Sequence, residues 1–121
     1  MIYLTDEQVG SLARDLHAVS AIEHWLFDLA HPELLKMMNR TWGRAVEQAK
    51  APFQFAPASG TAFFEPFGWR EEAFYSTMEE GRRLRREHRM AWFWRILSIF
   101  ASPARKEVAR RFSGYALMRR V

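Results

Sequence analysis

Three histidines spaced by seven residues are the first candidates for chemistry in this chain. His17, His24 and His31 would share one face of a continuous helix. Asp28, four residues after His24, would join them, and such a set could bind a metal ion. The helix would have to pass through the strand-like run at 22–29, and the residue before a proline, here His31, disfavours helix. We therefore predict three unrelated histidines and no metal site.

The basic run "RRLRREHR", residues 82–89, is the second candidate. Clustered arginines on a helix can follow phosphates, and Trp92 and Trp94 nearby could stack on bases. The same run also fits a solvated helix face whose guanidinium groups pair with neighbouring glutamates, which are Glu79, Glu80 and Glu87. A single basic helix is weak evidence for nucleic-acid binding, so we favour the solvated face and expect no nucleic-acid partner.

Composition narrows the class of protein. At 121 residues the chain is one domain, and 49% apolar with 26% charged residues is typical of a globular protein rather than a disordered one. The absence of cysteine excludes disulfides, thiolate zinc sites and a cysteine nucleophile. The first residues do not resemble a secretory signal, and the longest apolar stretch, 90–101, is interrupted by Arg95. We therefore expect a cytoplasmic protein without a membrane partner.

Local patterns predict alternating strands and helices. Thr5 and Gln8 form a capping box that starts a helix over 6–17. Apolar spacing predicts strands at 1–4, 22–29, 70–76 and 113–121. A helix is predicted from Pro32 to about 50, followed by a linker at 51–60 and a short helix closed by Gly68. A basic helix at about 78–88 follows a Thr77–Glu80 capping box, and an apolar helix at 90–101 ends before Pro103. This alternation predicts an α/β fold, a sheet with helices on its faces.

Three stretches together resemble a known family. They are "IYLTDEQVGSLARDL", "FFEPFGWREEAFYSTMEEGRRL" and "RRFSGYALMRR". They resemble the C-terminal half of class I S-adenosylmethionine-dependent methyltransferases, in particular the leucine-carboxyl-methyltransferase-like branch. The resemblance implies a Rossmann-like sheet made of a stub of strand four at 1–4 and strands five to seven, the last one antiparallel, with covering helices. Residues 1–121 would then be a partial methyltransferase domain that lacks the N-terminal cofactor-binding half.

The resemblance also implies a cofactor and a function. S-adenosylmethionine would sit against a glycine-rich loop, yet no G-x-G cluster lies between a strand and a helix here, so we expect the isolated chain not to bind it usefully. The chain would be the acceptor-side portion of an O-methyltransferase for an unknown small molecule, inactive alone, and paired with a complementing N-terminal half or with a second copy. Two alternatives stay open: a small basic nucleic-acid-binding module, and a non-catalytic protein that pairs through an exposed sheet edge.

Two residues are substrate-side candidates under this resemblance, because open α/β sheets bind ligands outside the carboxyl ends of their strands. Tyr3 would end strand four and serve as a wall or hydroxyl donor of the acceptor pocket. Asp28 would lie near the end of strand five and orient the substrate or act as a weak base. The alternatives are structural: Tyr3 packing against the next helix, and Asp28 accepting hydrogen bonds from the helix start near His31.

Overall fold

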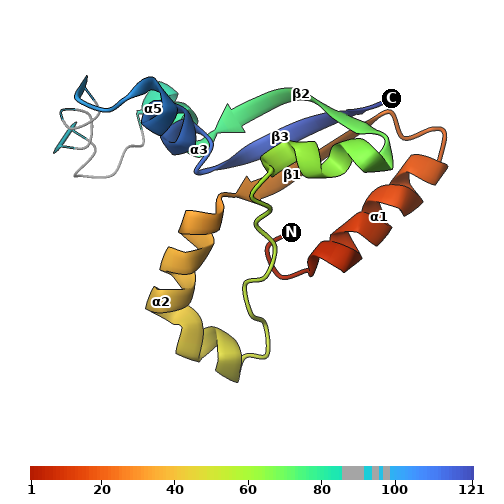
Figure 1. The fold of residues 1–121 in the computed structure, drawn as a ribbon, viewed down its shortest axis with the longest axis horizontal. Coiled ribbons are helices and arrows are strands. Elements are labelled where there is room, and N and C mark those ends of the chain that lie inside the picture. The colour runs from red at the N-terminus through yellow and green to blue at the C-terminus, as the bar shows by residue number, and fades with distance from the viewer. Residues whose placement is uncertain (86–91, 94–95, 97–98) are drawn as a thin grey trace.

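The computed structural model describes residues 1–85, 92–93, 96 and 99–121, and Figure 1 shows how they are arranged. Along the chain the elements are α1 (Asp6–Ala18), β1 (His24–Ala30), α2 (Pro32–Gln48), the 3-10 helix η1 (Gly60–Phe67), β2 (Trp69–Ser76), α3 (Thr77–Arg83), α5 (Pro103–Arg110) and β3 (Ser113–Arg120). The predicted α/β class is confirmed, and the strands predicted at 22–29, 70–76 and 113–121 match β1, β2 and β3 within two residues.

The three strands form one open sheet with the order β1-β3-β2. β3 pairs antiparallel with both neighbours, so β1 and β2 run in the same direction. The register places Leu26 beside Leu117, and Asp28 beside Tyr115, which in turn pairs with Tyr75. The last strand of the chain is therefore antiparallel, as predicted, and it occupies the centre of the sheet.

The strand predicted at 1–4 is wrong. Those residues form a turn in which the Leu4 amide donates to the Met1 carbonyl at 3.1 Å. The Ile2 carbonyl accepts from the amides of Gln54 and Phe55, at 2.7 and 3.0 Å, instead of from a strand. The linker before η1 thus satisfies backbone groups that the prediction assigned to a sheet, and α1 begins only two residues after Leu4.

Helix α1 forms where its sequence predicts. The Thr5 hydroxyl accepts from the Gln8 amide and the Gln8 side chain accepts from the Thr5 amide, which completes the predicted capping box. Val9 and Ala13, one turn apart on one face, are fully buried. The Trp69 indole donates to the Ala13 carbonyl at 2.9 Å, so a hydrogen bond as well as apolar contact joins α1 to β2.

Aromatic side chains dominate the core on the face of the sheet next to η1 (Figure 1). The ring centroids of Phe27 and Phe64 lie 4.7 Å apart, and those of Trp25 and Trp69 lie 5.7 Å apart. Trp69 is the largest of the fully buried side chains. The buried apolar cluster comprises Val9, Ala13, Phe27, Leu29, Phe55, Phe64, Trp69, Ala116 and Met118.

The region after β2 departs from the sequence-based expectation. Ser76, not Thr77, caps α3, because its hydroxyl accepts from the Glu79 amide. The helix ends at Arg83, short of residue 88, and Arg85 has a left-handed φ of 53°. Half of the residues of the apolar helix predicted for 90–101 lie outside the described residues. None of the described helices is both long and apolar enough to cross a membrane.

Candidate functional site

Asp28 projects from β1 near the carboxyl end of that strand. Its side chain is 57% exposed, and one carboxylate oxygen, Oδ1, accepts a hydrogen bond from the Met1 ammonium at 2.8 Å. The alternative prediction, that Asp28 bonds the start of α2, is wrong. His31 caps α2 instead, and the Nδ1 atom of His31 accepts from the Glu33 amide at 3.2 Å. The second carboxylate oxygen of Asp28 has no hydrogen-bond partner among the described residues.

Tyr3 lies in the turn that begins at Met1. Tyr3 is 55% exposed, and its ring centroid lies 5.6 Å from that of Phe53 in the linker. The Tyr3 carbonyl accepts from the Gln54 side chain at 3.0 Å. The structure therefore brings Tyr3 and Asp28 to one region through Met1, while no direct contact joins their side chains among the described residues.

The structure places the three histidines on different elements. His17 lies on α1, His24 begins β1 and His31 precedes α2, so they do not share a helix face. His24 Nε2 lies 2.9 Å from a Glu72 oxygen, an ion pair when the histidine is protonated. Within the described ranges no three metal-binding side chains come together.

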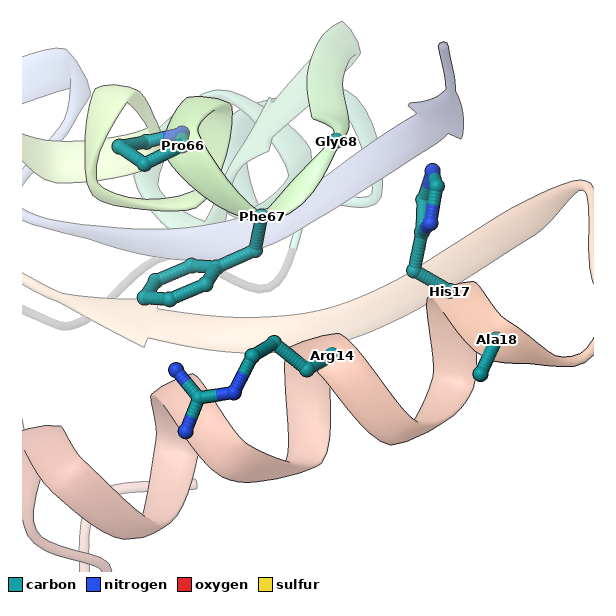
Figure 2. Close-up of a pocket in the computed structure, with 6 residues that line it drawn as sticks. All are labelled: Arg14, His17, Ala18, Pro66, Phe67 and Gly68. Carbon is teal, nitrogen blue, oxygen red and sulfur yellow. The ribbon is translucent and has the colours of Figure 1, made fainter.

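A shallow open hollow of about 390 Å³ lies between α1 and η1 (Figure 2). The Arg14 guanidinium lies 5.4 Å from the centroid of the Phe67 ring, and His17 Nε2 lies 3.2 Å from the Val121 carbonyl oxygen. The hollow opens at the amino ends of β1 and β2, whereas open α/β sheets place ligands at the carboxyl ends. We therefore assign no substrate to it. The residues that line it are Arg14, His17, Ala18, Pro66, Phe67 and Gly68.

Two features favour glycine at position 68, in the wall of this hollow: its left-handed backbone and the close approach of the His17 ring. Gly68 caps η1 with φ of 84°, and a Cβ there would lie 2.4 Å from His17 Nε2. We expect Gly68→Ala to lower the free energy of unfolding by about 2–3 kcal/mol in chemical denaturation, of which about 1 kcal/mol is the left-handed backbone.

Gly60 is the matched control for this substitution, because its φ is 59° and a Cβ there would meet nothing within 4 Å. Gly60→Ala should therefore show only the backbone cost, about 1 kcal/mol. In a His17→Ala background the Gly68→Ala cost should fall to the same value. Equal costs at the two glycines in the natural background would contradict the contact with His17.

A salt bridge between Glu71 and Arg111 joins β2 to the segment before β3. The Arg111 guanidinium forms two parallel hydrogen bonds with the Glu71 carboxylate, at 2.7 and 2.8 Å. The Thr61 hydroxyl donates to the same carboxylate, and Arg111 also bonds Glu107 at 3.1 Å and lies 4.8 Å from the Phe74 ring centroid. Both oxygens of Glu71 are occupied, so this group stabilises the fold and is not available for catalysis.

Acid should weaken this ion pair. The hydrogen bonds from Arg111 lower the pKa of Glu71 below its ordinary value of 4.5; the Thr61 bond and nearby arginine charges act the same way, and partial burial opposes them. Because the pKa is lower in the folded state, the stability that Glu71 contributes is complete above pH 4.5 and is lost as the pH falls through the folded pKa.

The checking measurement is the free energy of unfolding between about pH 5 and pH 2. The natural chain should lose stability on acidification more steeply than Glu71→Gln, which carries no titrating carboxyl at this position. Parallel curves for the two proteins would show that Glu71 titrates alike in the folded and unfolded states, against the geometry.

Residues 82–85 are the described part of the basic run, and Arg83 in it pairs with a glutamate. Arg83 contacts Glu80 at 2.7 Å, and Arg110 contacts Glu107 at 3.2 Å. Glu79 lies 4.0 Å from Arg110. The pair of Arg83 and Glu80 agrees with the solvated-face interpretation for that arginine, whereas Glu79 lies nearest Arg110, outside the basic run, and Glu87 and Trp94 lie outside the described residues.

Two exposed tyrosines near Asp28 escaped the sequence analysis. Tyr115 pairs with Asp28 in the sheet register and Tyr75 pairs with Tyr115, and their side chains are 53% and 46% exposed. Their proximity depends on β3 lying between β1 and β2, an order that no local pattern specifies. Only the alternation of buried and exposed residues along the final strand could have indicated that Tyr115 faces away from the core.

Comparisons with known proteins add no assignment: no protein-family model, no curated protein and no solved structure matches this chain.

Proposed function

We propose that this chain is the C-terminal, acceptor-side portion of an S-adenosylmethionine-dependent O-methyltransferase of the class I, Rossmann-like type. In this proposal β1, β2 and β3 correspond to strands five, six and seven of the family that the sequence resembles. The observation that carries it is the direction of the strands: β1 and β2 run the same way and the last strand is antiparallel to both. The sequence resemblance implies the same antiparallel last strand.

The residues present do not fit a cofactor site. Such a site needs glycine backbone between a strand and the start of the next helix, where amide groups meet the ligand. Here Gly60 and Gly68 bound η1, and Gly68 follows that helix rather than preceding one. The other four glycines lie inside regular elements: Gly10 in α1, Gly43 in α2, Gly81 in α3 and Gly114 in β3. The proposal therefore assigns cofactor binding to a polypeptide segment other than residues 1–121.

What this chain supplies is the acceptor side. Asp28, exposed near the carboxyl end of β1, has one carboxylate oxygen free to accept the proton that an acceptor hydroxyl loses on methylation. Tyr3, also exposed, presents a phenolic hydroxyl that can donate a hydrogen bond to the acceptor. Neither side chain is buried, so the chain alone does not exclude water from the reaction.

The proposal predicts that the isolated chain does not bind S-adenosylmethionine. Calorimetric titration of the cofactor into the folded chain should give no binding heat at cofactor concentrations up to about 1 mM, because the glycine-rich loop is missing. Circular dichroism on the same sample controls for folding. Micromolar affinity of residues 1–121 for S-adenosylmethionine would contradict the proposal that another segment binds the cofactor.

A further inference from the structure

The face of the sheet away from η1 is uncovered and consists of three rows of side chains. Leu26, Leu117 and Ala73 form the middle row, and Leu26 is 60% exposed. One flanking row, at the carboxyl end of β1, holds Asp28, Tyr115 and Tyr75. The other flanking row holds His24, Arg119 and Arg70, all exposed, with Glu72 beside them paired to His24.

These rows make the face complementary to itself. Consider a two-fold axis that lies midway between two stacked sheets and runs parallel to the middle row, perpendicular to the strands. Rotation about this axis places each strand over the same strand of the second molecule. The two superposed strands then run in opposite directions. The acidic and aromatic row then lies over the basic row of the second molecule. Asp28 faces His24, Tyr115 faces Arg119 and Tyr75 faces Arg70, while the leucines meet at the centre. Each of these contacts occurs twice.

The chemistry of the contacts is favourable in this orientation. Arginine over a tyrosine ring is an attractive pair. Asp28 and His24 already have partners within their own copy, the Met1 ammonium and Glu72, so the two arginine–tyrosine pairs carry the complementarity. Within the described residues no ion pair engages Arg70 or Arg119, so both are available. The alternative two-fold axis, parallel to the strands, would place Arg119 over Arg119 of the copy and is disfavoured by repulsion.

We propose that the chain self-associates by stacking this sheet face on the same face of a second copy, with the strands of the two sheets antiparallel. Packed sheets lie about 10 Å apart and align within about 30°. Three short strands offer only about 350 Å² in projection, well below the roughly 800 Å² of each partner in a standard interface. The dimer is therefore expected to be weak. The argument for association does not use the proposed function, but the stacked face includes Asp28, so an acceptor would reach that carboxylate only in the separated copies.

Single cysteines test the face directly, because the natural chain has none. Leu117→Cys lies on the proposed axis and should give a cross-linked dimer with a bismaleimide that spans about 8–10 Å. Met37→Cys, a half-exposed apolar site on α2, should give none. Comparable cross-linking at both positions, or none at Leu117→Cys, would overturn the proposal.

The orientation is tested by mixing two variants. His24→Cys and Asp28→Cys should cross-link with each other and much less with themselves, because each faces the other across the interface. Efficient cross-linking of either variant alone would contradict the antiparallel stacking. In sedimentation velocity the natural chain should shift toward dimer between about 10 and 500 µM, whereas Leu26→Lys, a change at an exposed edge position, should stay monomeric. A natural chain that remains monomeric at 500 µM would refute self-association.

Discussion

Replacing Trp69 by alanine is expected to lower the free energy of unfolding by about 4 kcal/mol. Trp69 is fully buried, and its ring lies 5.7 Å from Trp25 and 5.9 Å from His17. Its indole also donates to the Ala13 carbonyl at 2.9 Å, so truncation leaves a cavity and removes this hydrogen bond between β2 and α1. Urea denaturation followed by circular dichroism measures the loss.

Trp42→Ala is the control, since Trp42 is 53% exposed on α2; it should cost under about 1 kcal/mol. Trp69→Phe keeps most of the ring and removes the hydrogen bond, with an expected cost of about 1–2 kcal/mol. The assignment of Trp69 to the centre of the core would fail if Trp69→Ala and Trp42→Ala were equally mild. If Trp69→Ala loses the circular dichroism signal of the folded state while Trp69→Phe keeps it, the result supports the assignment of Trp69 to the centre of the core.

Replacing Arg111 by alanine is the second large effect, with an expected loss of about 2 kcal/mol. Arg111 holds Glu71 through two hydrogen bonds while its side chain is 33% exposed and that of Glu71 is 24% exposed. Its removal leaves a half-buried carboxylate without its cation. Because solvent reaches both groups, the loss stays below the 3–5 kcal/mol typical of a fully buried pair.

The exposed pair of Arg83 and Glu80 supplies the matched comparison for Arg111→Ala. Arg83 is 69% exposed, so Arg83→Ala should cost no more than about 0.5 kcal/mol in the same denaturation experiment. A double-mutant cycle with Glu71→Ala isolates the interaction between Arg111 and Glu71. A coupling near zero in that cycle would mean that the two side chains do not depend on each other in solution.

Sequence reasoning succeeded where structure is local. The capping box at Thr5 and Gln8 specifies the start of α1, and Pro32 marks the start of α2, because both features act within one helical turn. Gly68 was correctly placed at the end of a short helix, since a left-handed cap favours glycine. The apolar runs that became β1 and β3 were also recognised.

The errors arise where tertiary contacts decide. The residues at 1–4 read as a strand because they are apolar, yet the chain at Gln54 and Phe55 takes their backbone bonds. The bond between Glu71 and Arg111 joins residues forty positions apart, and no pattern within one element reveals it. At the candidate site, the exposure of Asp28 depends on which face of the sheet is covered, and its bond to Met1 depends on the turn that replaced the strand.

The most direct test of the proposed function is a titration of S-adenosylmethionine into the polypeptide that is translated when the codons preceding Met1 are included. The account predicts that those codons, read in the same frame, encode a strand, a glycine-rich loop and a helix. The extended polypeptide should then bind the cofactor with micromolar affinity while residues 1–121 alone do not. Binding by residues 1–121 alone, or an extended polypeptide that has no such loop and does not bind, would contradict it.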